Sequence, residues 1–310
     1  MDIQYLLLLQ ELRNATGGIF DEFFNALSKF AVDILPFLPF VLFWCVDKKW
    51  GYRFITTISV GQVLNGVIKL TVCAYRPWIR SDLIEPAGDS KVAATGYSFP
   101  SGHTMCATTM YGSTAVWQHK KRRWLSVLCV VLILLTAFSR NFLGVHTPQD
   151  VIVGLIESAL LIFVIGKAES YVGDNEKLKD RLTIAGAVLT IGVLLYVIFK
   201  PYPMDYVDGV LLVDPQKMMN DIFKACGQLL GFFLASYIDR HYTHYEIPKA
   251  SRTLPVLACV GLAILIAWKE WFGPATLVLA FGGHWGNLIA RFLIPPFALL
   301  LWPMVIKKVE

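Results

Sequence analysis

The sequence predicts an all-α fold, a polytopic membrane helix bundle of about nine transmembrane helices. Two observations lead to this prediction. The 310-residue chain is 55% hydrophobic and only 16% charged, with a mean hydropathy of +0.55, which is too apolar for a water-soluble protein of this length. The apolar residues are also gathered into runs of about 20 residues, the length that a helix needs to cross a hydrocarbon core of about 30 Å.

The chain begins with a segment, residues 1–29, that differs from the rest. Its first part, Met1 to Arg13, is a short apolar stretch with acidic residues and no basic leader. We therefore expect a helix that lies in the membrane interface, not a secretory signal. The nine expected spans follow at residues 30–46, 53–72, 101–118, 124–140, 148–166, 182–199, 220–238, 253–271 and 284–306.

The basic residues of the loops predict the orientation. If the spans alternate strictly, sixteen of the 28 Lys and Arg residues fall on one side. The positive-inside rule makes that side cytoplasmic, so we expect the N terminus outside and the C terminus inside. The net charge of +5 then reflects loops that face anionic lipid, and no nucleic-acid partner is expected. The sixteen are Lys48, Lys49, Arg53, Lys120, Lys121, Arg122, Arg123, Lys167, Lys177, Lys179, Arg181, Arg240, Lys249, Arg252, Lys307 and Lys308.

A first polar motif stands at the outer end of the second span. Lys69 and Arg76 are seven residues apart, and Pro77 follows directly. If the helix continues that far, two helical turns place both cations on one face, where they can hold the same anion. Taken alone, the two side chains are better explained as interfacial cations that snorkel toward water.

A second motif, Pro100-Ser101-Gly102-His103, opens the third span. Ser101 is a good N-cap, and Gly102 leaves the amides of the first turn uncovered, so an anion can bind the helix N-terminus. His103 beside that anion site has the chemistry of a proton donor, since the reference pKa of histidine is near 6.5. A capping motif with an incidental histidine explains the same residues.

The third motif joins the fourth and fifth spans and contains Ser139-Arg140, His146 and Asp150. Thr147 is suited to the N-cap and Pro148 to the first helical position, which leaves His146 just before the helix. Asp150 on the first turn can accept a hydrogen bond from one ring nitrogen of His146 and so fix the tautomer in which the other nitrogen attacks phosphorus. Alternatively, Asp150 merely neutralises the helix dipole.

Together the three motifs resemble the type 2 phosphatidic acid phosphatase family, whose pattern K-x6-RP, PSGH and SR-x5-H-x3-D is matched at every specified position. The resemblance covers roughly residues 30–166 and implies a metal-independent phosphatase without a cofactor. It implies that His146 is the nucleophile, that Asp150 orients it and that His103 is the general acid. The implied phosphate-binding residues are Lys69, Arg76, Ser101, Gly102, His103 and Arg140.

The remaining chain is expected to serve as accessory transmembrane helices, residues 167–310, after a catalytic core at 30–166. The nine-span layout is similar to that of glucose-6-phosphatase and the sphingosine-phosphate phosphatases. Glu157 and Arg291 fall inside expected spans, where a charge usually finds a partner. We expect one or both to support the helix packing or, less favoured, the site. His241 and His244 have a spacing that invites a metal assignment, but no cysteine lies near them, which favours a solvated loop.

All three motifs fall on the predicted non-cytoplasmic side. A site at the outer mouth of a helix bundle suits a phosphate whose lipid tail stays in the membrane, so a lipid phosphate or a polyprenyl diphosphate is the expected substrate. Two alternatives remain: a small soluble ester such as a sugar phosphate, or a lipid transporter that retains an anion site. The pairing of His146 with Asp150 counts against a transporter, because anion binding needs no oriented nucleophile. The sequence leaves the oligomeric state open.

Overall fold

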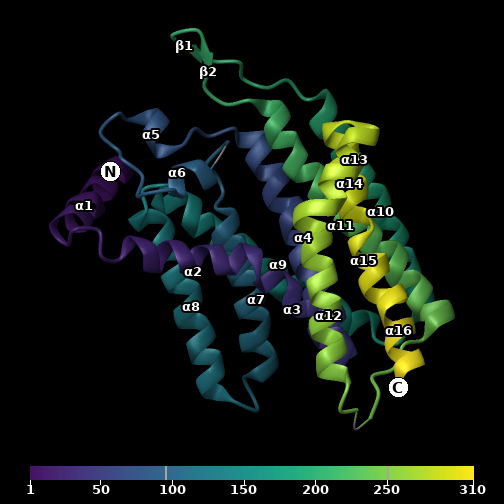
Figure 1. The fold of residues 1–310 in the computed structure, drawn as a ribbon. Helices are drawn as coiled ribbons and strands as arrows, with labels where there is room; N and C mark the ends of the chain where they lie inside the picture. The colour runs from purple at the N-terminus through teal and green to yellow at the C-terminus, as the bar shows by residue number, and fades with distance from the viewer. Residues whose placement is uncertain (95, 250) are drawn as a thin grey trace. The chain divides into compact units, whose positions relative to one another are not determined.

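The structure is a computed structural model that describes residues 1–94, 96–249 and 251–310, and it is mostly helical, with one short two-stranded hairpin in the described residues (Figure 1). The expected all-α fold is confirmed. Within the described residues, seven helical segments are long and apolar enough to cross a membrane. They are Asp21–Val46, Lys48–Arg80, Arg123–Phe142, Pro148–Val172, Glu176–Phe199, Leu254–Phe281 and Gly283–Val309.

The expected count of nine spans is not confirmed. The other two expected spans correspond to helices α7 (Gly102–Gln118) and α11 (Pro215–Ile238). Helix α7 has 17 residues and is rich in hydroxyl-bearing side chains, whereas α11 carries Lys217, Asp221 and Lys224 in its first half. Helix α7 is therefore shorter than the seven segments above, and α11 is interrupted by charged residues.

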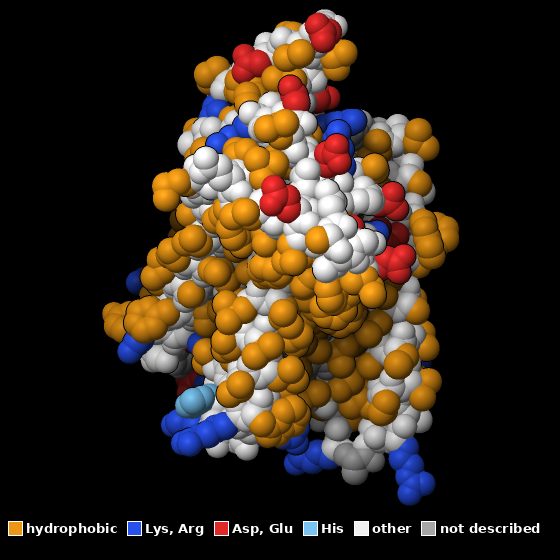
Figure 2. Space-filling model, turned by 90° about the vertical axis from the view of Figure 1, so that its left-hand side faces the viewer, with side chains coloured by type: hydrophobic (Ala, Val, Ile, Leu, Met, Phe, Trp, Pro, Cys, Tyr) orange, Lys and Arg blue, Asp and Glu red, His pale blue; other side chains and the backbone are white. Residues whose placement is uncertain are grey.

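Apolar side chains are exposed on the long helices, as expected of surfaces that face lipid. On α8 (Arg123–Phe142), Val127 is 63% exposed and Leu134 is 57% exposed. Figure 2 shows hydrophobic side chains over the middle of one face, with basic side chains gathered at its lower end and acidic ones toward its upper end. A soluble protein rarely exposes so large an apolar surface, and the chain is a multi-pass membrane protein.

The chain packs as two compact units. The first contains residues Met1–Pro36, Leu64–Phe163 and Pro201–Met218, and the second contains Phe37–Val63, Val164–Lys200 and Met219–Glu310. All residues of the three motifs lie in the first unit. The division into segments 1–29, 30–166 and 167–310 stays a prediction.

Around the motif residues, the first unit holds two N-terminal helices, short helices and a small hairpin. A hydrophobic cluster that includes Phe24, Phe142 and Val145 fixes the second N-terminal helix against α8, with the Phe24 and Phe142 ring centroids 4.7 Å apart. The elements are α1 (Asp2–Ala15), α2 (Asp21–Asp33), the end of α4 (Lys48–Val72), α5 (Pro77–Arg80), α6 (Ser90–Ala93), α7, α8, the start of α9 (Pro148–Val172), β1 (Tyr206–Val207) and β2 (Val210–Leu211). The two strands pair antiparallel.

Helix α1 is hydrogen-bonded to the loop that follows α5. Arg13, which is 6% exposed, donates to the Glu85 carbonyl at 2.5 Å. Gln10 donates to the Leu83 carbonyl at 3.1 Å and accepts from the Glu85 amide at 2.9 Å. These bonds fix α1 to the first unit, while its position in the membrane interface stays a prediction.

The second unit is built from long helices with tight contacts. Gly227 of α11 packs closely against the backbone of Leu288. A Cβ atom added to Gly227 would lie 2.2 Å from the Leu288 carbonyl oxygen, so this close approach requires a small residue. Trp44 donates to the Ala298 carbonyl at 2.6 Å. The remaining elements are η1 (Leu35–Phe37), at the boundary of the two units, then α3 (Leu38–Val41), η2 (Leu42–Val46), α10 (Glu176–Phe199), η3 (Asp239–Thr243), α12 (Leu254–Ala267), η4 (Trp268–Phe272), α13 (Gly273–Phe281), α14 (Gly283–Phe292), α15 (Ile294–Pro296), η5 (Phe297–Leu301) and α16 (Trp302–Val309).

Candidate active site

Lys69 and Arg76 do not share one continuous helix. Helix α4 ends at Val72, and Cys73 has a φ of 53°, a left-handed conformation that cannot continue a right-handed helix. Arg76 precedes α5 in an extended conformation. The sequence analysis placed both cations on one helical face on the condition that the helix continues from Lys69 to Arg76, and this condition is wrong. Arg76 instead lies in the loop between α4 and α5, and that loop brings its side chain to the site.

Both cations nevertheless bind the backbone that surrounds the second and third motifs. Lys69 Nζ donates to the carbonyl oxygens of Tyr97, Ser98 and Pro100 at 3.2, 3.3 and 2.7 Å. Arg76 Nη1 donates to the Val145 carbonyl at 2.9 Å and lies 2.9 Å from His146 Nε2. Arg76 is only 6% exposed, so its charge acts in a medium of low polarity.

The start of α7 is formed as the sequence predicts. Ser101 is the N-cap, and its Oγ accepts from the Thr104 amide at 3.3 Å and from Thr104 Oγ1 at 2.9 Å. The Ser101 amide donates to the Asp150 carbonyl at 2.9 Å. A Cβ atom on Gly154 would lie 3.0 Å from the Ser101 carbonyl oxygen. The first turns of α7 and α9 are thus held in direct contact.

His146 and Asp150 form the centre of the arrangement. Asp150 Oδ2 is 3.3 Å from His146 Nδ1, and it accepts from Ser98 Oγ at 2.5 Å and from the Thr147 amide at 2.8 Å. Helix α9 begins at Pro148, and the Asp150 amide donates to Thr147 Oγ1 at 3.4 Å, as the predicted cap requires. The carboxylate therefore orients one ring nitrogen and leaves Nε2 on the side of Arg76.

The environment keeps His146 neutral. Its exposed fraction is 2%, and this burial, together with the Arg76 guanidinium, holds the pKa of His146 well below its usual range, although the Asp150 carboxylate acts in the opposite direction. A neutral imidazole whose Nδ1 hydrogen bonds to Asp150 has its lone pair on Nε2. In the structure this lone pair faces Arg76 Nη1 at 2.9 Å.

Arg140 and His103 complete the set. Arg140 Nη1 donates to Ser28 Oγ of α2 at 2.8 Å, and its buried Nε makes no hydrogen bond to any residue that the structure describes. His103 interacts electrostatically with Arg140, His146, Arg76 and Lys69. Gly102 lies in the same first turn of α7. A Cβ atom added to Gly102 would lie 3.7 Å from Asn65 Oδ1, an ordinary van der Waals distance. The structure thus brings together every motif residue that the sequence singled out.

Four neighbouring residues were not foreseen: Ser28, Asn65, Ser98 and Asn141. Asn141 Nδ2 donates to the His146 carbonyl at 2.9 Å. None of them stands out by residue type or spacing, since serine and asparagine are common in loops and helix ends. Their contacts arise only when segments distant in sequence meet.

Glu157 and Arg291 differ in their surroundings. Glu157 Oε1 accepts from Asn65 Nδ2 at 2.5 Å, next to the start of α7, and its buried Oε2 has no hydrogen bond to a described residue. Arg291 belongs to the second unit, where it interacts with Glu270 and Asp221. The supporting role expected of both stays a prediction. His241 pairs with Asp180 at 3.0 Å.

Comparison with known protein families matches the part of the chain that carries these residues. The model of the PAP2 superfamily matches residues 50–173, a range that contains all three motifs. The chain carries a PAP2 superfamily domain. The resemblance to type 2 phosphatidic acid phosphatases is therefore confirmed.

Curated relatives carry phosphatase names. The undecaprenyl-diphosphatase of Sulfolobus acidocaldarius is 27% identical over 148 residues, which cover 48% of this chain and 68% of that protein. Lipid phosphate phosphatase delta of Arabidopsis thaliana is 29% identical, covering 57% of this chain but 43% of its own length. Human sphingosine-1-phosphate phosphatase 2 is 25% identical and covers 76% of this chain and 55% of its own length. No solved structure matches the chain.

Proposed function

We propose that the PAP2 domain hydrolyses a phosphate ester through a phosphohistidine formed on His146. The observation that carries the proposal is the orientation of this buried ring, whose Nδ1 lies 3.3 Å from Asp150 and whose Nε2 lies 2.9 Å from Arg76. A phosphorus atom that approaches Nε2 meets the guanidinium at the same time. An anion-binding site alone has no need of an oriented lone pair beside the anion.

In the first step, Nε2 of His146 attacks phosphorus and the bond between phosphorus and the leaving oxygen breaks. His103 transfers a proton to that oxygen, so the alcohol or phosphate leaves neutralised. Arg76, Arg140 and the amides at the start of α7 stabilise the negative charge that spreads over the equatorial oxygens. Lys69 fixes the backbone that carries those amides and adds its own charge.

In the second step, water attacks the phosphohistidine. His103, now neutral, accepts a proton from the water as its oxygen bonds to phosphorus and the bond between phosphorus and Nε2 breaks. Inorganic phosphate leaves, and His146 returns to the neutral form with its Nδ1 hydrogen bond to Asp150. The buried guanidinium groups supply the charge stabilisation throughout, so the proposed cycle needs no metal.

The proposed substrate is a lipid phosphate or a polyprenyl diphosphate, bound at the non-cytoplasmic face. Ser28 of helix α2 contacts Arg140. The N-cap residue of this helix, Phe20, and Phe23 within it are 48% and 53% exposed, which suits an entrance beside acyl chains. The names of the relatives, which include an undecaprenyl-diphosphatase and a lipid phosphate phosphatase, agree with that substrate class.

The activity is tested by release of inorganic phosphate from a substrate panel. We expect the purified protein to act on undecaprenyl diphosphate, phosphatidic acid or sphingosine 1-phosphate in preference to glucose 6-phosphate. His146→Ala should abolish release, whereas His119→Ala, at the exposed C-terminal end of α7, should leave it unchanged. Faster turnover of the sugar phosphate, or lipid movement across liposomes without phosphate release, would overturn the proposal.

The face is tested separately by labelling single cysteines in a cysteine-free background. Asp82 lies in the loop after α5 and Lys121 lies between α7 and α8. With a membrane-impermeant maleimide, Asp82→Cys should react in intact cells and Lys121→Cys only after permeabilisation. The reverse pattern would place the site on the cytoplasmic face.

A further inference from the structure

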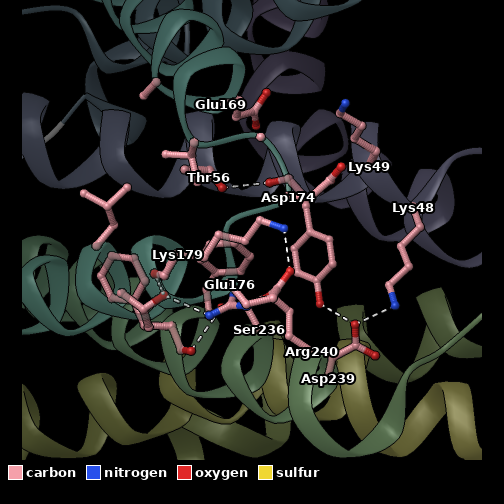
Figure 3. Close-up of a pocket in the computed structure, with 18 of the residues that line it drawn as sticks. Lys48, Lys49, Thr56, Glu169, Asp174, Glu176, Lys179, Ser236, Asp239 and Arg240 are labelled. Atoms are coloured by element: carbon pink, nitrogen blue, oxygen red, sulfur yellow. Dashed lines mark hydrogen bonds and ion pairs between the residues drawn. The ribbon is translucent and has the colours of Figure 1, made fainter.

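The second unit contains a cavity that has no part in the chemistry above. Its volume is about 960 Å³, and it lies where the start of α4, the end of α9, the start of α10 and the end of α11 meet (Figure 3). Its apolar wall includes Val172, Leu182 and Phe232. These are ends of long helices, so the cavity is positioned where a membrane passes from acyl chains to headgroups.

Most cations of the cavity are already paired with carboxylates. Lys48 Nζ lies 2.7 Å from Asp239 Oδ2, a carboxylate that also accepts from Tyr52 at 2.6 Å. Lys179 lies 2.6 Å from Glu176. Arg240 lies 3.3 Å from Glu176 as well. Figure 3 draws these lining residues and marks interactions between them with dashed lines. Their charges are largely cancelled, so they offer no excess of positive charge to an anion.

Three charged lining residues lack such a partner. Lys49, Asp174 and Glu246 line the cavity and are exposed, and none of them forms an ion pair with the part of the chain that the structure describes. Lys49 interacts electrostatically with Glu169, which itself lies 3.5 Å from Arg53. Among the described residues, one ammonium group that forms no ion pair therefore stands with two carboxylates that form none, beside the apolar wall.

We propose that this cavity binds a phosphoethanolamine headgroup, supplied by a zwitterionic membrane phospholipid. The phosphate binds Lys49, and the primary ammonium donates to Asp174 and Glu246. The first part of an acyl chain packs on Leu182 and Phe232. A purely anionic headgroup fits less well, because it places a negative charge beside two unmatched carboxylates. A choline headgroup has the positive charge but no N–H to donate.

Native mass spectrometry of the delipidated full-length protein tests the site. The protein is titrated with phosphatidylethanolamine, phosphatidylcholine and phosphatidylglycerol in separate experiments. We expect phosphatidylethanolamine to bind most tightly. Lys49→Gln and Asp174→Asn should each weaken it roughly two- to fivefold, the effect of losing one exposed ion pair, and the double variant should weaken it by about tenfold.

Matched controls separate the site from general charge effects. Lys177→Gln and Asp82→Asn remove exposed charges that do not line the cavity, and both should bind phosphatidylethanolamine as the wild type does. Glycerophosphoethanolamine identifies the source of the headgroup, since it should compete only at concentrations far above those of the lipid. Equal competition by this soluble compound would overturn a lipid as the source. Tighter binding of phosphatidylglycerol, or unchanged binding by the double variant, would overturn the site itself.

Discussion

Asp150→Asn separates orientation of the nucleophile from binding of the phosphate. The carboxylate accepts from Ser98, Thr147 and His146 at 2.5, 2.8 and 3.3 Å through one oxygen. An asparagine keeps the shape and one acceptor oxygen but loses the charge. Hydrogen bonds to charged groups contribute about 1.5–3 kcal/mol and neutral ones about 0.5–1.5 kcal/mol. The difference of about 1–1.5 kcal/mol means that weaker orientation alone lowers kcat by roughly 5- to 13-fold.

The tautomer adds to this effect. If the amide NH2 group turns toward His146, Nδ1 becomes the acceptor and Nε2 carries the proton, which removes the nucleophile. The corresponding change in serine protease triads lowers kcat by about 10⁴. We therefore expect kcat to fall by about 10² to 10⁴, while KM stays the same or decreases, because loss of a buried negative charge favours an anionic substrate.

The assay is phosphate release under saturating and limiting substrate, with thermal unfolding to show that the variant is folded. Asp82→Asn, on the exposed loop after α5, is the control and should match the wild type. A folded Asp150→Asn protein with kcat within threefold of the wild type, or with a change in KM alone, would refute the role given to the carboxylate.

Three further predictions concern the surroundings of the nucleophile. Because the pKa of His146 is well below its usual range, the acid limb of kcat/KM should lie below pH 6.5 after correction for substrate ionisation, and an acid limb near pH 7 would contradict this expectation. The same lowered pKa makes the free energy of unfolding fall as the pH drops below 6.5, because the histidine of the unfolded chain binds its proton first. Ser28→Ala removes the hydroxyl that accepts from the site arginine and should lower kcat/KM by roughly tenfold, whereas Ser170→Ala, on an exposed helix turn, should change nothing. Glu157→Gln weakens the buried contact with Asn65 and should lower activity or the melting temperature; a variant unchanged in both would exclude a supporting role.

The sequence predicted the helical architecture and the composition of the site for a definite physical reason. Long apolar runs have few alternatives to membrane helices, because every backbone polar group must be paired in lipid. The caps at Ser101 and Thr147 are local features that depend on neighbouring residues only. Both were therefore foreseen at the right positions.

The path of the chain between helices was less predictable. The break after Val72 depends on a single left-handed residue, Cys73, and cysteine does not signal such a turn. Ser98 and Ser28 reach Asp150 and Arg140 across 52 and 112 residues. Contacts at that separation depend on the packing of whole helices, which the spacing of residues in one segment does not reveal.

The covalent intermediate is the central claim, and rapid-quench labelling tests it most directly. Substrate carrying ³²P in the transferred phosphoryl group is mixed with the enzyme, quenched in alkali within the first turnover and digested into peptides. We predict an acid-labile, alkali-stable label on the peptide that contains His146. Label on any other peptide, or full turnover in which no label passes through His146 at any quench time, would contradict the account.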